Sequence, residues 1–340
     1  MQLVGIGDLH LDSPLAQYIP NHNKVVLDEV RLVVDWAVER SIKTVILYGD
    51  IGHKPQLSYD AHCRLISLFS DYPHIRFIIV KGNHDTKSDS ENSLLILKQL
   101  ERSKGVPNIR VIDERPTVLF EKTDTPVYVL PWPFSKTKQD MLNVLHTEVD
   151  GAKWDTGRPV ACTNKINPKH LSVLGHIHTA QRIGNAHFSG TLYQTNFGEK
   201  PNKYFHHIIW TGDVKTSKVK LIPHVPKYTL LNAVIESKKQ VKDLPKDKHT
   251  LIKVFVNKDV VLPDDVFDAM PNVVKFNNFS SKEELQVLMR QELSLDDLSS
   301  EVRLDLDSML NDWMLANNTD KELMNRVPDV LTNLLSKAKR

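Results

Sequence analysis

Four short segments of this sequence end in side chains that can bind a metal ion or move a proton. They are GDLH (residues 7–10), GDIGH (49–53), GNHD (82–85) and GHIH (175–178). Each follows an apolar run and opens with a glycine, which lets the backbone turn sharply and approach an ion closely. Because the side chains are Asp, Asn and His, they predict a cation site with oxygen and imidazole donors.

A simpler role exists for any one of these segments. An Asp that follows a strand commonly caps a turn or the start of a helix. Four such clusters in order favour a shared site instead, because adjacent polar histidines at the end of a buried strand need partners. The isolated histidines are interpreted as ordinary structural or surface residues: His22, His62, His74 and His187.

The elements that must position these segments follow an α/β pattern up to about residue 155. Apolar runs at 3–6, 44–48, 75–80 and 127–130 predict strands, and the stretches at 24–40 and 90–102 predict helices. Further strands are predicted at 160–163, 171–174, 186–189, 205–210 and 218–222. Strand ends in an α/β sheet point their loops into a common crevice, so we expect the four segments at one sheet edge.

The pattern divides the chain into three parts. Residues 1–223 are predicted to form the domain that carries the site, and residues 224–280 a small α/β capping domain. The capping domain is predicted as strand, helix, strand, helix, strand, with strands at 228–235, 250–256 and 272–279. Residues 281–340 are predicted to be helical, with capping-box sequences at Ser281 and Thr319.

Composition excludes several classes of protein. The 340 residues are 41% hydrophobic and 25% charged, as in an ordinary soluble protein. Cys63 and Cys162 are the only cysteines, so neither a disulfide framework nor a thiolate zinc site is expected. No signal-peptide pattern or run of about 20 apolar residues occurs, which predicts a cytoplasmic protein with no membrane partner. The net charge of +2 allows a polyanionic partner without requiring one.

The four segments resemble the signature of the calcineurin-like metallophosphoesterases. Residues 127–133 (VYVLPWP), 188–199 (FSGTLYQTNFGE) and 203–208 (KYFHHI) also resemble the SbcD family, the nuclease subunit of DNA double-strand-break repair complexes, including its bacteriophage members. This resemblance covers about residues 1–223. It implies an α/β fold, a two-sheet metallophosphoesterase sandwich flanked by helices, followed by a small α/β cap domain and C-terminal helices.

The resemblance also implies how the site works. It implies two divalent metal ions. Oxygen and imidazole donors without thiolates favour Mn²⁺, with Mg²⁺, Fe²⁺ or Zn²⁺ possible. One ion would take Asp8, His10, Asp50 and His178, and the second would take Asp50, Asn83 and His176. Asp50 would therefore bridge the ions. His84 would assist the leaving oxygen, with Asp85 orienting its ring and His53 supporting it.

One ligand of the family is missing from this pattern. Relatives have a further histidine at the end of the strand before the GHIH segment, whereas the strand predicted at 159–163 runs into Asn164. Asn164 is therefore predicted as a weak ligand through its amide oxygen. His146 and His170 are the alternatives, although both are expected at the surface. The strength of the second metal site depends on how this position is filled.

The predicted C-terminal helices carry two apolar stripes at helical spacing. The first is Val302, Leu306, Met309, Leu310 and Trp313, and the second is Leu323, Val327, Leu331, Leu334 and Leu335. A hairpin that packs on its own domain would show the same spacing. In the SbcD family these helices dock on the SbcC ATPase, so the resemblance implies an SbcC-like partner.

The leading hypothesis is a metal-dependent DNA exonuclease and endonuclease, acting in DNA repair, recombination and replication as the subunit of an SbcCD-like complex. It would act in the host cytoplasm if it is phage-encoded, and a homodimer is compatible with it. One alternative is a free-standing phosphoesterase acting on nucleotides or phosphoproteins, and the cap and the stripes argue against it. The other is a scaffold subunit with weakened catalysis, which Asn164 keeps open.

Overall fold

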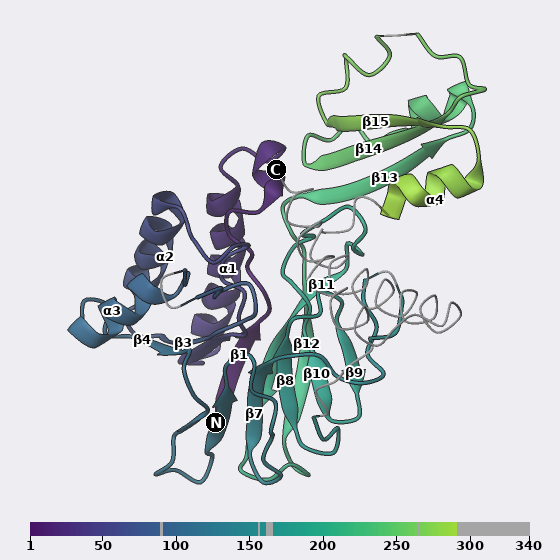
Figure 1. The fold of residues 1–340 in the computed structure, drawn as a ribbon. Coiled ribbons are helices and arrows are strands. Elements are labelled where there is room, and N and C mark those ends of the chain that lie inside the picture. The colour runs from purple at the N-terminus through teal and green to yellow at the C-terminus, as the bar shows by residue number, and fades with distance from the viewer. Residues whose placement is uncertain (89–90, 156, 161–165, 264, 291–340) are drawn as a thin grey trace, which may run out of the picture. The chain divides into compact units, whose positions relative to one another are not determined.

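The computed structural model describes residues 1–340 except 89–90, 156, 161–165, 264 and 291–340 (Figure 1). Its first sheet has the strand order β12-β11-β1-β2-β3-β4. The strands are β1 (Gln2–Ile6), β2 (Thr44–Leu47), β3 (Arg76–Val80), β4 (Ile109–Ile112), β11 (Lys203–Ile209) and β12 (Lys218–His224). Strands β1 to β4 are parallel, and α1 (His22–Glu39), α2 (Tyr59–Asp71) and α3 (Leu95–Ser103) connect them in turn. A short 3-10 helix, η1 (Pro14–Gln17), precedes α1.

The second sheet has the strand order β5-β6-β7-β8-β10-β9. Its strands are β5 (Thr117–Leu119), β6 (Val127–Leu130), β7 (Leu142–His146), β8 (Ser172–Gly175), β9 (Gln181–Ile183) and β10 (Ala186–Phe188). The neighbours β6, β7, β8 and β10 are parallel. Their carboxyl ends therefore lie at one edge of this sheet.

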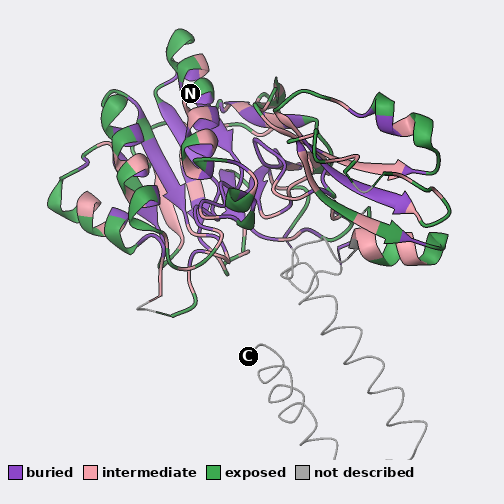
Figure 2. Cartoon of the chain, turned by 90° about the horizontal axis from the view of Figure 1, so that it is seen from above, coloured by how far each residue is buried: buried purple, intermediate pink, exposed green. Residues whose placement is uncertain are grey.

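Alternation of side chains along the strands builds two apolar layers. Val4, Val45 and Phe77 face one side of the first sheet, where they pack with the buried faces of α1 and α2. Ile46 and Ile78, on the opposite side, pack with residues of β6, β7 and β8. The fold is thus the α/β two-sheet sandwich that we expected, and Figure 2 shows the buried strands beside helices whose outer faces are exposed.

A third, three-stranded sheet follows the sandwich along the chain. It consists of the parallel strands β13 (Thr229–Ile235), β14 (Thr250–Asn257) and β15 (Val273–Phe279). The 3-10 helix η2 (Lys238–Asp243) joins β13 to β14. In the described residues between β14 and β15, turns are found in place of the expected helix. This segment contains Pro263 and Pro271, and proline disfavours a helix interior because it has no N–H to donate. Gln194 links this sheet to the loop after β10, since its side chain exchanges two hydrogen bonds with the backbone of Leu230.

Several element boundaries differ from the expectation. The helix expected at 90–102 begins only at Leu95, whereas α1 agrees within two residues. Ser281 directly precedes α4 (Lys282–Arg290) and accepts a hydrogen bond from the backbone N–H of Glu284 at 3.1 Å, which is one half of the predicted capping box. The Glu284 carboxylate accepts from the backbone N–H of Ser280 and not from that of Ser281. The strand expected at 160–163 and the apolar stripes after residue 300 lie wholly or mostly outside the described residues. None of the described helices has the length and apolar character needed to cross a membrane.

Candidate metal centre

The polar segments meet where the two sheets present the carboxyl ends of their parallel strands. From the first sheet, Asp8 and His10 follow β1, Asp50 follows β2, and Asn83 and His84 follow β3. From the second sheet, His146 ends β7, and His176 and His178 follow β8. Backbone bonds hold the first two segments together, since the N–H groups of Leu9 and His10 both donate to the carbonyl of Asp50. The expected convergence at one edge is therefore present.

One group of donors surrounds a point between His10 and His178. The Nε2 atoms of these two rings lie 3.0 Å apart. The nearest carboxylate oxygens are those of Asp8, 3.6 Å from His178 Nε2, and Asp50, 4.0 Å from His10 Nε2. The other nitrogen of His10, Nδ1, is buried without a hydrogen-bond partner among the described residues. No hydrogen bond through Nδ1 therefore explains the burial of the His10 ring. The imidazole and carboxylate groups around its Nε2 are donors that fit a divalent cation.

A second group of donors lies on the other side of Asp50. His146 Nε2 lies 3.2 Å from the Asp50 carboxylate and 2.8 Å from the amide oxygen of Asn83. The same amide oxygen lies 2.9 Å from Nδ1 of His176. These donors are again oxygen and imidazole, and Asp50 is common to both groups.

The position of His146 corrects the expectation that it lies at the surface. It is 0% exposed, and its Nδ1 donates a hydrogen bond to the carbonyl of Tyr48 at 2.9 Å. β7 is one of the two strands that pair with β8, and His146 is its last residue. A histidine at the end of the preceding strand, which the sequence pattern lacks at Asn164, is therefore present at the end of β7. Asn164 lies outside the described residues, and His170 is half-buried and hydrogen-bonded to Thr137.

Left-handed backbone conformations occur at three of these residues. His10, Asp50 and His176 have φ angles of 45°, 49° and 89°, which non-glycine residues rarely adopt. A glycine is required nearby, because a Cβ at Gly82 would lie 2.0 Å from an Asp50 carboxylate oxygen. Three residues with rare backbone conformations at one sheet edge indicate a site shaped by function.

A layer of acceptors around the donors fixes how the imidazoles face the site. His178 donates through Nδ1 to Glu199 at 2.9 Å, which leaves Nε2 for the site. Glu199 also accepts from the ammonium group of Lys203 and the hydroxyl of Thr195. Burial alone would raise the pKa of Glu199, but the charges of Lys203 and His178 lower it to about 2. Glu199 was not among the residues predicted for the site.

The buried carboxylates make the centre strongly attractive to positive charge. Burial would raise the pKa of Asp50, but the charge of His146 and its hydrogen bond hold that pKa well below the usual range. Burial would lower the pKa of His146, and yet Asp50 and Asp8 raise it to about 9. The site is therefore built to hold cations, as the donor set also indicates.

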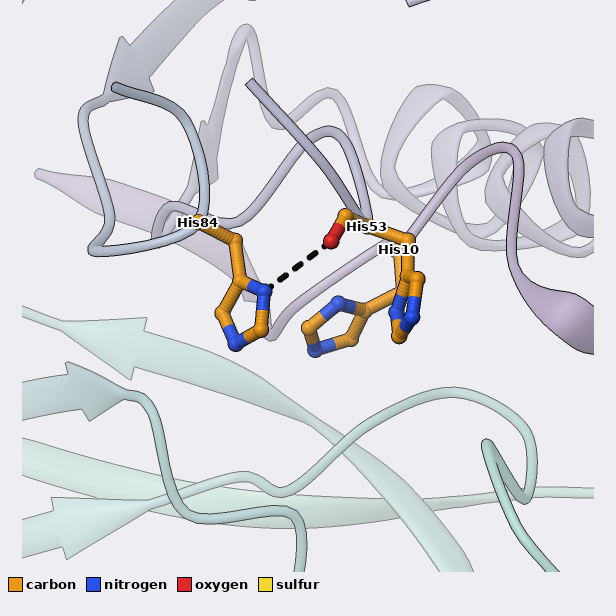
Figure 3. A group of neighbouring side chains, drawn as sticks. All are labelled: His10, His53 and His84. Atoms are coloured by element: carbon orange, nitrogen blue, oxygen red, sulfur yellow. Dashed lines mark hydrogen bonds between the residues drawn. The ribbon is translucent and has the colours of Figure 1, made fainter. Parts of the chain in front are cut away.

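His84 lies beside these donors with its ring held from the backbone (Figure 3). Its Nδ1 donates to the carbonyl of His53 at 3.0 Å, and its backbone N–H donates to Asp50 at 2.9 Å. The rings of His53 and His84 stack with centroids 5.8 Å apart, and the His10 ring lies 5.0 Å from that of His84. His53 thus contacts His84 through its ring and its carbonyl.

Asp85 has a different role from the one expected. It is fully buried and accepts hydrogen bonds from the backbone N–H groups of Ile51, Gly52 and Gly82 and from the hydroxyl of Ser93. These bonds join the loop after β2 to the loop after β3. Asp85 therefore positions the loops that carry the donors. The His84 ring is oriented by the carbonyl of His53 and not by Asp85.

Comparison with known proteins agrees with this geometry. A family model described as calcineurin-like phosphoesterase matches residues 1–180. The chain belongs to the calcineurin-like phosphoesterase family. It is also 26% identical over 145 residues to a 4-hydroxy-tetrahydrodipicolinate synthase of Herminiimonas arsenicoxydans, a match that covers 38% of this chain. The chain spans about half of that relative, 48% of its length.

Proposed function

We propose that this chain is a metal-dependent DNA phosphodiesterase, with exonuclease and endonuclease activity, and the nuclease subunit of an SbcCD-like complex. The observation that carries the proposal is the pair of donor groups that share Asp50, with His84 beside them. Asp8, His10 and His178 would hold one Mn²⁺, and Asn83, His146 and His176 a second. A pair of divalent cations bound here would activate water and neutralise charge on the phosphodiester.

The protein's own residues position the metal donors and supply a proton to the leaving oxygen. His84 carries its Nδ1 proton toward the carbonyl of His53, so its Nε2 is the nitrogen that can serve the leaving oxygen. Asp85 keeps the loops that carry Asp50 and Asn83 in register through its four hydrogen bonds. Glu199 keeps His178 oriented.

DNA is proposed as the substrate because of what accompanies the site. The stretches 127–133, 188–199 and 203–208 resemble the SbcD family. The sheet of β13, β14 and β15 is attached directly to one of these stretches, through Gln194 to Leu230 and through Phe197 to Asn232. A small-substrate phosphatase has no use for such an added domain.

The scaffold alternative loses support in the site itself. The scaffold hypothesis depended on a missing histidine, and His146 now completes the second donor group. The synthase name of the matched relative gives no second candidate, because that match covers 38% of the chain and the site has the donors of a metallophosphoesterase.

The direct test is cleavage of end-labelled linear duplex and single-stranded DNA with Mn²⁺. The wild-type protein should cleave, and Asp50→Ala, which removes the carboxylate common to both donor groups, should not. Cys63→Ser is a matched control, because Cys63 is an exposed residue on α2. Asp50→Ala protein that cleaves DNA at the wild-type rate would refute the proposal.

The ATPase partner is tested separately. Truncation after Leu293 should preserve Mn²⁺-dependent cleavage, since every proposed ligand precedes residue 179, and should abolish binding to an SbcC-like ATPase. Trp313→Ala should weaken that binding, because a Trp at the centre of an interface often contributes more than about 2 kcal/mol. Both positions lie outside the described residues. A lower melting temperature with unchanged partner affinity would mean that Trp313 packs within its own chain.

A further inference from the structure

Two tryptophans lie against the ring of His176, at the second donor group. The Trp132 ring is stacked on it, with centroids 5.8 Å apart and an interplanar angle of 27°. The Trp154 ring meets it edge to face, with centroids 5.5 Å apart and an angle of 70°. His176 thus has an aromatic group on two sides while its Nδ1 points to Asn83.

The two tryptophans differ in what else they contact. Trp154 packs against a buried apolar cluster that includes Leu145, Leu174 and Phe188, so its burial is explained by the fold. Trp132 is half-buried and belongs to none of the four apolar clusters that the described residues form. A large aromatic side chain placed beside a metal-binding residue, without a place in the core, points to a ligand.

The backbone fixes Trp132 close to the donors. Trp132 lies two residues after β6, and its N–H donates to the carbonyl of Lys81 at 2.9 Å. Lys81 directly follows β3 and precedes Asn83 by two residues. The backbone of Trp132 is therefore bonded to the segment that carries Asn83, so the position of its main chain relative to the site is set by the fold.

Exposed lysines occur in the two segments that carry these tryptophans. Lys136 and Lys138 are exposed in the loop that carries Trp132, and Lys153 is exposed next to Trp154. Aromatic rings interleaved with lysines are the arrangement by which proteins bind single-stranded nucleic acid, with bases on the rings and phosphates near the cations.

We propose that Trp132 is a stacking platform for an unpaired nucleobase of the strand being cut, next to the second donor group. The inference rests on the proposed function. Bases in a duplex are already stacked on their neighbours, so an indole can take up only a base that is unpaired or at a frayed end. The site therefore recognises single-stranded DNA or melted ends at this position.

The test is a cycle of protein and substrate changes. Binding of fluorescent single-stranded oligonucleotides, intact or with one abasic site scanned across the cut position, is measured in Ca²⁺ buffer. Base stacking corresponds to roughly a 5-fold to 150-fold change in affinity. One abasic position should weaken wild-type binding by this factor, and Trp132→Ala should weaken binding of the intact strand equally with no further loss at that abasic position. Trp132→Phe should retain part of the effect.

Phe134→Ala is the matched control, because Phe134 is 40% exposed in the same loop, and it should behave as wild type. If Trp132→Ala weakens intact and abasic strands by the same factor, Trp132 only supports His176 and the inference is wrong. It is also wrong if Trp132→Ala has no effect. Wild-type protein that hydrolyses bis(4-nitrophenyl) phosphate but neither binds nor cleaves DNA would instead overturn the proposed function itself.

Discussion

Replacing Glu199 by Gln should weaken the fold and the metal centre by separate routes. Glu199 is 5% exposed, and its partner Lys203 is 4% exposed. The variant leaves the Lys203 charge buried opposite a neutral amide, and removing one partner of a buried ion pair typically costs about 3–5 kcal/mol. We expect a loss of about 3 kcal/mol in the free energy of unfolding, because the amide oxygen of Gln still accepts one hydrogen bond.

The metal centre should weaken because His178 loses the carboxylate that accepts its Nδ1 proton at 2.9 Å. Partners of this kind typically change metal affinity about 10-fold to 100-fold. Urea unfolding in EDTA measures the first effect, and Mn²⁺ titration calorimetry measures the second.

The double variant Glu199→Gln/Lys203→Met separates the two routes. It removes the unpaired charge, so stability should recover while Mn²⁺ affinity stays low. The reasoning is refuted if Glu199→Gln unfolds within about 0.5 kcal/mol of wild type, or if the double variant regains Mn²⁺ affinity together with stability.

Three further predictions follow from the same geometry. His84→Ala should lower turnover about 10²-fold to 10⁴-fold with unchanged Mn²⁺ binding by calorimetry, and loss of bound Mn²⁺ would make His84 a ligand. Asp85→Asn should lower the free energy of unfolding by about 1–3 kcal/mol, measured by urea unfolding in EDTA, because an amide cannot accept all four of its hydrogen bonds. Burial lowers the pKa of His206 from 6.5 to about 3, so the folded state keeps it neutral while the unfolded state takes up a proton. The free energy of unfolding should therefore fall as the pH drops below 6.5, by about 2 kcal/mol at pH 5 from this residue. His206→Gln can still bond to Tyr48 and should lose less stability between pH 7 and 5, as measured by urea unfolding.

Much of the site was predictable because it is local in sequence. Asp8, Asp50 and Asn83 each follow a parallel strand, and parallel strands in one sheet place their ends at one edge. The apolar runs that end in these residues therefore predicted both the sheet and the convergence of its loops.

The parts that were missed depend on contacts between distant segments. His146 also ends an apolar run, LNVLH, but the strand next to the GHIH segment was assigned to 160–163, and the pairing of β7 with β8 is not visible in the sequence. Glu199 reaches His178 across a loop, and nothing in the spacing distinguishes it from a surface acid. Asp85 bonds backbone groups more than 30 residues away, which no local pattern encodes.

The central claim is that Asp50 joins two groups of metal donors, one of which is completed by His146. A crystal structure of the protein soaked in Mn²⁺, with anomalous scattering recorded, tests it most directly. We predict two anomalous peaks, one among Asp8, His10 and His178 and one among Asn83, His146 and His176, with an Asp50 oxygen contacting both. A single peak, or a second peak that His146 does not contact, would contradict the account.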